Sequence, residues 1–141
     1  VTSIDLDFRE LEEHNLKLQA KYDRIREDEG EFDEYRCEDA DVILVSYGIS
    51  SRIAKSAVDA ARGDNIKAGL FRPITLFPFP AEELKALAER GCSFISVEMS
   101  DGQMREDIRL ATGCKDVALV SRFGGNLIGR DQITEKIREV A

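Results

Sequence analysis

The apolar and polar residues of this chain follow one repeated scheme, a short unbroken apolar run and then a helix-like repeat. The scheme is clearest in Asp41–Ser51, where Val42–Val45 are all apolar and Gly48 ends the run. A strand has this composition when helices cover both of its faces. Ser50 and Ser51 come directly after the glycine, and we expect them to cap the helix that follows.

Four strand-then-helix units of this kind fill the chain to its end. After the first strand, further strands are predicted at Ile66–Phe71, Cys92–Val97 and Val117–Val120. The helices are predicted at Arg52–Arg62, at Ala81–Arg90, from a cap at Asp101 to Ala111, and after a cap at Asp131, with Ile133, Ile137 and Val140 facing inward. Such alternation predicts an α/β fold, in which helices cover both faces of a parallel sheet and the crossovers are right-handed. Glu31–Cys37, where apolar residues stand among charges, is predicted to be a short edge strand.

A long helix precedes this domain. Asp7 can accept the amide of Glu10 while Glu10 reaches back to the amide of Asp7, and Leu6 can pack on Leu11 across that cap. Apolar residues recur at alternating gaps of three and four, at Phe8, Leu11, Leu18, Tyr22 and Ile25, with Asn15 at the remaining position. So narrow a stripe packs against one neighbour only.

The helix is predicted to end near Glu29, with Gly30 as a left-handed stop. Acidic residues meet the negative end of the helix dipole there, so we expect the last turn to fray. We interpret residues 1–30 as a linker or docking helix and residues 31–141 as the α/β domain.

All three prolines lie in the nine residues Arg72–Pro80, together with Leu76, Phe77 and Phe79. Dense proline predicts a stiff, extended loop, and Pro80 suits the start of the next helix. Apolar side chains on such a loop mark an interface with another protein surface, or else they fold under and cover the domain's own helix ends.

Length and charge narrow the class of protein. A chain of 141 residues suits one domain with a real core. Residues 1–40 hold 14 acids and 6 bases, a net charge of −8, while residues 41–141 are balanced. We interpret the acidic N-terminal segment as a solvated helix, and its charge disfavours nucleic acid as a partner.

No apolar run is long enough to cross a membrane, and no secretory signal is evident. The start at Val1 suggests a processed chain or a piece of a longer one.

Cysteine and histidine are sparse. Cys37, Cys92 and Cys114 are widely spaced, and His14 is the one histidine. A metal or iron–sulfur site built by this chain alone is therefore not expected. An odd cysteine count favours a reducing cytoplasm, and Cys92 is expected to be a buried, inert thiol.

The candidate ligand site is the crevice at the carboxyl ends of the strands, where strand order reverses. It would be lined by Gly48, Ser50 and Ser51 on one side and by Glu98, Asp101 and Gln103 on the other. The glycine turn could hold a phosphate, or it could be an ordinary turn with a serine cap. Glu98 could act as a base or bind a ribose hydroxyl, but a glutamate here more often bonds to nearby loop amides or to a neighbouring domain.

Two other loops carry candidate contacts. Arg122 with Gly124 and Gly125 could form an anion-binding nest, although a plain loop or subunit contact is favoured. Arg72, Phe77, Pro78 and Phe79 are the candidate interface residues of the proline loop. No residue spacing suggests nucleophilic catalysis, so no catalytic residue is assigned.

Three of these loops, taken in order, resemble one family. YGISSRIA (Tyr47–Ala54), LFRPITLFPFP (Leu70–Pro80) and VEMSDGQMREDIR (Val97–Arg109) are similar to the alpha subunit of 2-oxoacid:ferredoxin oxidoreductases. The similarity is to the C-terminal, transketolase C-terminal-like domain. The opening TSIDLDFRELEEHNLKLQAKY (Thr2–Tyr22) most resembles the branched-chain 2-oxoisovalerate group.

The resemblance implies a three-layer α/β/α domain with a five-stranded, mostly parallel sheet whose first strand is an antiparallel edge. It implies a parent enzyme that oxidatively decarboxylates a 2-oxoacid to its acyl-CoA. That enzyme would use thiamine diphosphate, magnesium, a [4Fe-4S] cluster and coenzyme A, and would reduce ferredoxin. Those sites would lie in other domains or subunits, so this chain would bind no cofactor and would serve assembly.

Two alternatives stay open at this point. One is an independent flavodoxin-like domain that binds a nucleotide or flavin in the Gly48/Glu98 crevice. The other, weaker one is a receiver-type signalling domain, which would need a phosphoacceptor aspartate where Tyr47 and Glu98 stand.

Overall fold

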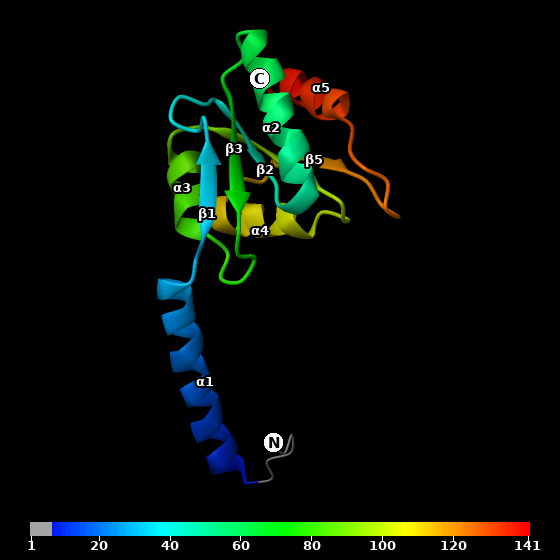
Figure 1. Ribbon diagram of the computed structural model, residues 1–141. Helices are drawn as coiled ribbons and strands as arrows, with labels where there is room; N and C mark the ends of the chain where they lie inside the picture. The colour runs from blue at the N-terminus through cyan, green and yellow to red at the C-terminus, as the bar shows by residue number, and fades with distance from the viewer. Residues whose placement is uncertain (1–6) are drawn as a thin grey trace.

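A computed structural model describes residues 7–141 (Figure 1). In that range the chain forms five helices and five strands. In chain order they are α1 (Phe8–Asp28), β1 (Phe32–Tyr35), β2 (Val42–Val45), α2 (Gly48–Gly63), β3 (Ala68–Pro73), α3 (Ala81–Glu89), β4 (Ser93–Glu98), α4 (Gln103–Thr112), β5 (Ala118–Ser121) and α5 (Arg130–Val140). The predicted α/β fold is confirmed.

The strands form one sheet in the order β1-β3-β2-β4-β5. β2 pairs in parallel with β3 on one side and β4 on the other, and β4 pairs in parallel with β5. β1 pairs antiparallel with β3, with Phe32 opposite Pro73 and Tyr35 opposite Leu70. The predicted antiparallel edge strand is therefore confirmed, and strand order reverses between β2 and β4.

Two apolar clusters hold the sheet between its helix layers. One joins β2, β3 and β4 to α2 and α5, and the other joins the opposite face to α3 and α4. All four residues of β2 are buried, as expected of a central strand covered on both faces. The six buried residues of α2 are three alanines, two serines and a valine, and these small side chains let the helix lie close to the sheet.

Helix ends differ from the sequence predictions in four places. α2 begins at Gly48, so Ser50 and Ser51 lie inside its first turn and donate to the carbonyls of Tyr47 and Gly48 instead of capping it. The N-cap of α4 is Gly102, not Asp101, and the N-cap of α5 is Gly129, not Asp131. α1 ends at Asp28 with Glu29 as its C-cap, and Gly30 is not left-handed.

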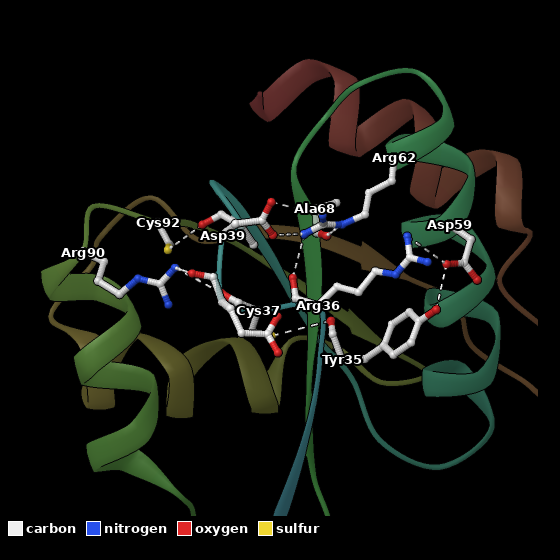
Figure 2. Close-up of polar contacts among 11 residues, drawn as sticks. Tyr35, Arg36, Cys37, Asp39, Asp59, Arg62, Ala68, Arg90 and Cys92 are labelled. Atoms are coloured by element: carbon white, nitrogen blue, oxygen red, sulfur yellow. Dashed lines mark hydrogen bonds and ion pairs between the residues drawn. The ribbon is translucent and has the colours of Figure 1, made fainter.

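The segment between β1 and β2 is clamped at the amino edge of the parallel strands (Figure 2). Arg62 of α2 donates to the carbonyls of Ala68 (2.7 Å) and Arg36 (2.8 Å) and pairs with Asp39 (2.6 Å). From the other face, Arg90 donates to the carbonyls of Cys37 (3.1 Å) and Glu38 (2.7 Å). The two guanidinium groups therefore fix this connection from both helix layers.

Gly69 of β3 explains why the clamped segment can lie so close to the sheet. A Cβ atom at this position would lie 2.8 Å from the carbonyl oxygen of Arg36 and 3.1 Å from the Cα of Cys37. Only a residue without a side chain leaves room for that approach.

α1 stands apart from these layers and extends away from the sheet domain (Figure 1). None of its residues is buried. Asp7 caps it by accepting the amides of Arg9 (2.9 Å) and Glu10 (3.1 Å), as predicted, while the predicted contact of Leu6 with Leu11 lies outside the described residues. The expected acidic helix is wrong: α1 holds six acids and five bases, and residues 29–39 around β1 hold six acids and one base. Acidic side chains on an edge strand discourage pairing with a foreign strand.

Candidate functional site

The two sides of the predicted crevice do meet, at the carboxyl ends of β2 and β4. Ser46, at the end of β2, donates through its hydroxyl to the carbonyl of Val97 (2.8 Å) and lies 3.0 Å from the hydroxyl of Ser50. Ser46, Ser50 and Ser51 are all buried. Ser46 therefore ties the end of β2 to β4 and to the start of α2, whereas Ser51 bonds within α2.

Glu98 is completely buried at the end of β4. Its carboxylate accepts hydrogen bonds from the hydroxyls of Ser96 (2.7 Å) and Ser100 (2.5 Å) and from the amides of Met104 (3.2 Å) and Arg105 (3.1 Å). The carboxylate thus meets the amino end of α4, where a negative charge is favoured by the free amides and the helix dipole. It performs the capping role expected of Asp101.

Asp101 and Gln103 lie beside this buried carboxylate but are exposed. Gly102 between them is left-handed, with φ of 92°, and lies under the guanidinium of Arg105. Gly102 is itself buried, so this side presents the side chains of Asp101 and Gln103 to solvent, while both oxygens of the buried Glu98 carboxylate are hydrogen-bonded to the protein.

The thiols give no sign of a reactive or metal-binding centre. Burial raises the pKa of Cys37 to about 12, and the nearby Glu34 carboxylate adds to this shift. Burial also raises the pKa of Cys92, whose thiol contacts the Ala40 carbonyl at 3.2 Å. Across residues 7–141, no three His, Cys, Asp or Glu side chains are grouped so that they could hold a metal ion.

Exposed apolar side chains gather instead at the carboxyl edge of the sheet. They occupy the start of α2 and the loops that follow β3 and β5, and all are about half exposed: Ile49, Ile74, Leu76, Phe77, Phe123 and Leu127. We call these six residues the carboxyl-edge surface. Apolar groups collected at one end of a molecule mark an interaction site more often than scattered ones do.

The proline loop divides the residues that sequence analysis treated together. Phe77 is 60% exposed, whereas Pro78 is buried and Phe79 packs against the core cluster under α3 and α4. Arg72 is exposed and pairs with Asp33 of β1 at 3.1 Å. The expectation that this loop covers the core therefore holds for Phe79, while the exposed Phe77 leaves the interface a prediction.

The glycine loop after β5 lies at the same edge. Gly124 and Gly125 are exposed and left-handed, with φ of 63° and 80°. Arg122 is exposed, and its Nε lies 3.4 Å from Oε1 of Gln132, which also accepts the amide of Gly129 at the start of α5. Arg122 therefore contacts the first turn of α5, the helix that follows this loop.

α1 joins the molecule at this edge, because β1 begins opposite the end of β3. The connection between α1 and β1 is hydrogen-bonded to the proline loop. Thr75 accepts a hydrogen bond from the amide of Glu31 (3.0 Å) and donates one to the carbonyl of Pro78 (2.9 Å). Tyr22 meets Phe77 edge to face, with ring centroids 6.0 Å apart. Along the rest of the helix, Phe8 is 88% exposed and Leu16 is 64% exposed.

Sequence reasoning missed the arginine clamps and Leu110. Leu110 of α4 is 84% exposed. The inward spacing of Met104, Ile108 and Ala111 places position 110 off the buried face, so the helical repeat could have singled it out. The clamps leave no comparable signal, because an arginine that donates to carbonyls looks like any surface arginine in sequence.

Comparison with known proteins gives the family. Residues 40–133 match the family described as pyruvate:ferredoxin oxidoreductase core domain II. The chain belongs to this family. It is 65% identical over its whole length to the ketoisovalerate oxidoreductase subunit VorB of Methanothermobacter marburgensis, and 38% identical over 101 residues, 71% of this chain and 27% of the relative, to the 2-oxoglutarate synthase subunit KorA of the same organism. The chain spans 40% of the length of that VorB subunit.

Solved structures agree with the fold. A 2-oxoglutarate:ferredoxin oxidoreductase from Magnetococcus marinus, solved with 2-oxoglutarate, coenzyme A and succinyl-CoA bound, matches 96% of this chain with 24% of its own, at a TM-score of 0.81 and 20% identity. The alpha chain of a probable 2-oxoacid ferredoxin oxidoreductase from Thermoplasma acidophilum matches 77% of this chain with 94% of its own, at a TM-score of 0.51 and 22% identity. The core domain II family and its three-layer fold therefore agree with the resemblance seen in sequence.

Proposed function

We propose that this chain is the non-catalytic assembly domain of a 2-oxoacid:ferredoxin oxidoreductase subunit, and that α1 and the carboxyl-edge surface dock it on the rest of the enzyme. The observation that carries the proposal is the gathering of exposed apolar side chains at the one edge from which α1 projects. Burying such surface yields roughly 25 cal/mol per Å², so docking would stabilise both partners.

The parent enzyme would convert a branched-chain 2-oxoacid to its acyl-CoA and pass electrons to ferredoxin. Support for the branched-chain substrate comes from the 65% identity to a ketoisovalerate oxidoreductase subunit. Other subunits of the oxidoreductase are the proposed partners, with a reducing cytoplasm as the proposed location. The structure contains no helix long and apolar enough to span a membrane within the residues it describes.

The cofactors proposed for the parent enzyme are thiamine diphosphate with magnesium and a [4Fe-4S] cluster, with coenzyme A as co-substrate. The described residues do not fit these groups. Glu98 is buried and fully hydrogen-bonded, and the thiols of Cys37 and Cys92 lie in the core. A cluster needs several thiolates in reach of one another, and burial keeps these two thiols protonated. We therefore derive no chemical step from this chain.

An independent flavodoxin-like domain is the alternative, and it is disfavoured. Its ligand would have to enter the Gly48/Glu98 crevice, where the serine hydroxyls and the carboxylate are already hydrogen-bonded to the protein. The receiver-type alternative is also disfavoured, because Glu98, the acid at the end of β4, is buried.

The test is to change the carboxyl-edge surface in the full-length subunit and purify the complex. Phe77→Asp with Phe123→Asp should release the subunit from its partners and lower ketoisovalerate-dependent ferredoxin reduction in proportion, with an unchanged KM in the fraction that still assembles. Lys67→Glu, at the exposed opposite edge, is the matched control. Normal assembly with an altered KM would instead assign this edge to substrate binding.

A further inference from the structure

A groove of about 830 Å³ lies between the end of α1, the proline loop, and helices α3 and α4. Its apolar walls include Leu76, Phe77 and Phe79 on one side and Leu110 and Ala111 on the other. Leu110 is 84% exposed and Phe77 is 60% exposed, and both side chains line this one groove, so they form a shared apolar surface. An occupant that covers Leu110 and Phe77 must therefore bring apolar side chains of its own.

Carboxylates dominate the rim of this groove. Glu82 and Glu83 stand in the first turn of α3, Asp107 lies on α4, and Glu27 lies at the end of α1. Among the described residues that line the groove, Arg26 is the one base, and it already pairs with Asp23 at 2.8 Å. Lys85, the nearest counter-charge of Glu82, is at 4.0 Å. The rim is therefore complementary to a cationic partner.

Asp107 adds to the negative charge around the groove. Partial desolvation raises the pKa of its carboxyl, and the buried charge of Glu98 raises it further. A cation placed nearby would favour the ionised carboxylate. The groove thus holds negative charge that its own side chains leave poorly compensated.

We propose that a segment of the same subunit, outside residues 1–141, fills this groove with apolar side chains against Leu110 and Phe77 and with Lys or Arg side chains beside Glu82, Glu83 and Asp107. The inference rests on the proposed assembly function and specifies which side chains would make the contact. The curated relative is longer, since this chain spans 40% of it. The last turn of α1 lines the groove, and Phe8, Leu11, Leu16 and Tyr22 are exposed along the same helix, so a partner that packs along α1 also reaches the groove.

The test places a photoreactive benzoylphenylalanine at position 110 in the full-length subunit within the assembled enzyme, with position 67 at the opposite edge as the control. After irradiation, mass spectrometry should map the cross-link from position 110 to a segment of the same polypeptide that has Lys or Arg next to apolar residues. A cross-link to a different subunit, to a second copy of this surface or to an acidic segment would overturn the proposal. So would a yield no greater than that from position 67.

A charge test follows in the same cross-linkable protein. Glu82→Gln with Glu83→Gln should lower the cross-link yield several-fold and make it less sensitive to salt, because the charge attraction is lost. Glu89→Gln, an exposed change on the same helix outside the groove, should leave the yield unchanged. Equal yields in both variants would refute the basic character of the segment. If the subunit assembles normally but the cross-link lies elsewhere, only this inference fails; if assembly ignores the carboxyl-edge surface, the proposed function fails.

Discussion

Glu98 is the residue that decides how the strand-end crevice is understood. Sequence analysis placed it correctly at a strand end and named contact with loop amides or with a neighbouring domain as its more common roles, of which the structure shows the first. The sequence could not predict that two serine hydroxyls and two amides would all converge on it, because these contacts depend on the left-handed turn at Gly102. Residue type and position were predictable here, and the local hydrogen bonding was not.

We predict that Glu98→Gln lowers the free energy of unfolding by about 2–3 kcal/mol, because the new amide group would point a donor at groups that themselves donate. Urea unfolding followed by circular dichroism measures this, with Asp101→Asn as the exposed control that should stay within about 0.5 kcal/mol of the parent chain. A Glu98→Gln variant with an unchanged free energy of unfolding would mean that the carboxylate does not stabilise the fold.

The thiol of Cys37 gives a prediction about alkaline pH. Its pKa is raised from 9.0 to about 12 in the folded chain, so below pH 9 both folded and unfolded states carry the neutral thiol and its contribution is fully present. Between pH 9 and 12 only the unfolded state ionises, and stability falls by up to about 1.4 kcal/mol per pH unit from this group. Urea unfolding across that range should show a shallower fall of the free energy of unfolding with pH for Cys37→Ala than for the parent chain. A pH-independent difference in stability between the two proteins does not affect this comparison. Parallel curves for the two proteins would contradict the pKa shift.

At the scale of elements, period and length predicted the strands and helices well, because central strands and amphipathic helices leave strong patterns. Their ends were less predictable. Sequence rules assign caps to Asp and Ser side chains, whereas here the cap of α4 comes from Glu98 on the preceding strand, and Gln132 binds the amide of Gly129 at the start of α5. At α4 a contact made by the fold replaced the local rule, whereas at α5 Gln132 binds back three residues, which is half of a local capping box.

The arginine clamp on the β1–β2 connection is a second feature that only the fold reveals. We predict that Arg62→Leu lowers the free energy of unfolding by about 2–3 kcal/mol, because the carbonyls of Arg36 and Ala68 lose their donors. Asp39→Asn removes only the more exposed ion-pair partner and should lower stability clearly less than Arg62→Leu does. Chemical denaturation of the two variants separates these roles, and equal losses would show that the ion pair matters as much as the carbonyl contacts.

At the scale of the whole molecule, exposed apolar side chains are divided between the carboxyl edge, α1 and Leu110. The sequence pointed to the proline loop and to α1 separately. It could not show that they share one end of the molecule, since this follows from β1 running antiparallel to β3.

The two phenylalanines of the proline loop should behave differently. Phe77→Ser should change the free energy of unfolding of this chain by less than about 1 kcal/mol, because its ring is mostly exposed. Phe79→Ser should lower it by about 2–3 kcal/mol, because its ring packs on the core under α3 and α4. Thermal unfolding of the single variants measures both effects, and similar losses for the two would assign both rings to the core.

Hydrogen–deuterium exchange tests the central claim most directly. The comparison is between this chain alone and the same residues within the full-length subunit of the purified complex. Docking predicts that the amides of α1 and of residues 74–80 exchange much more slowly in the complex, while those of α5 change little. Equal exchange of α1 and the proline loop in both samples would show that nothing packs on them, and the account of this chain as an assembly domain would be wrong.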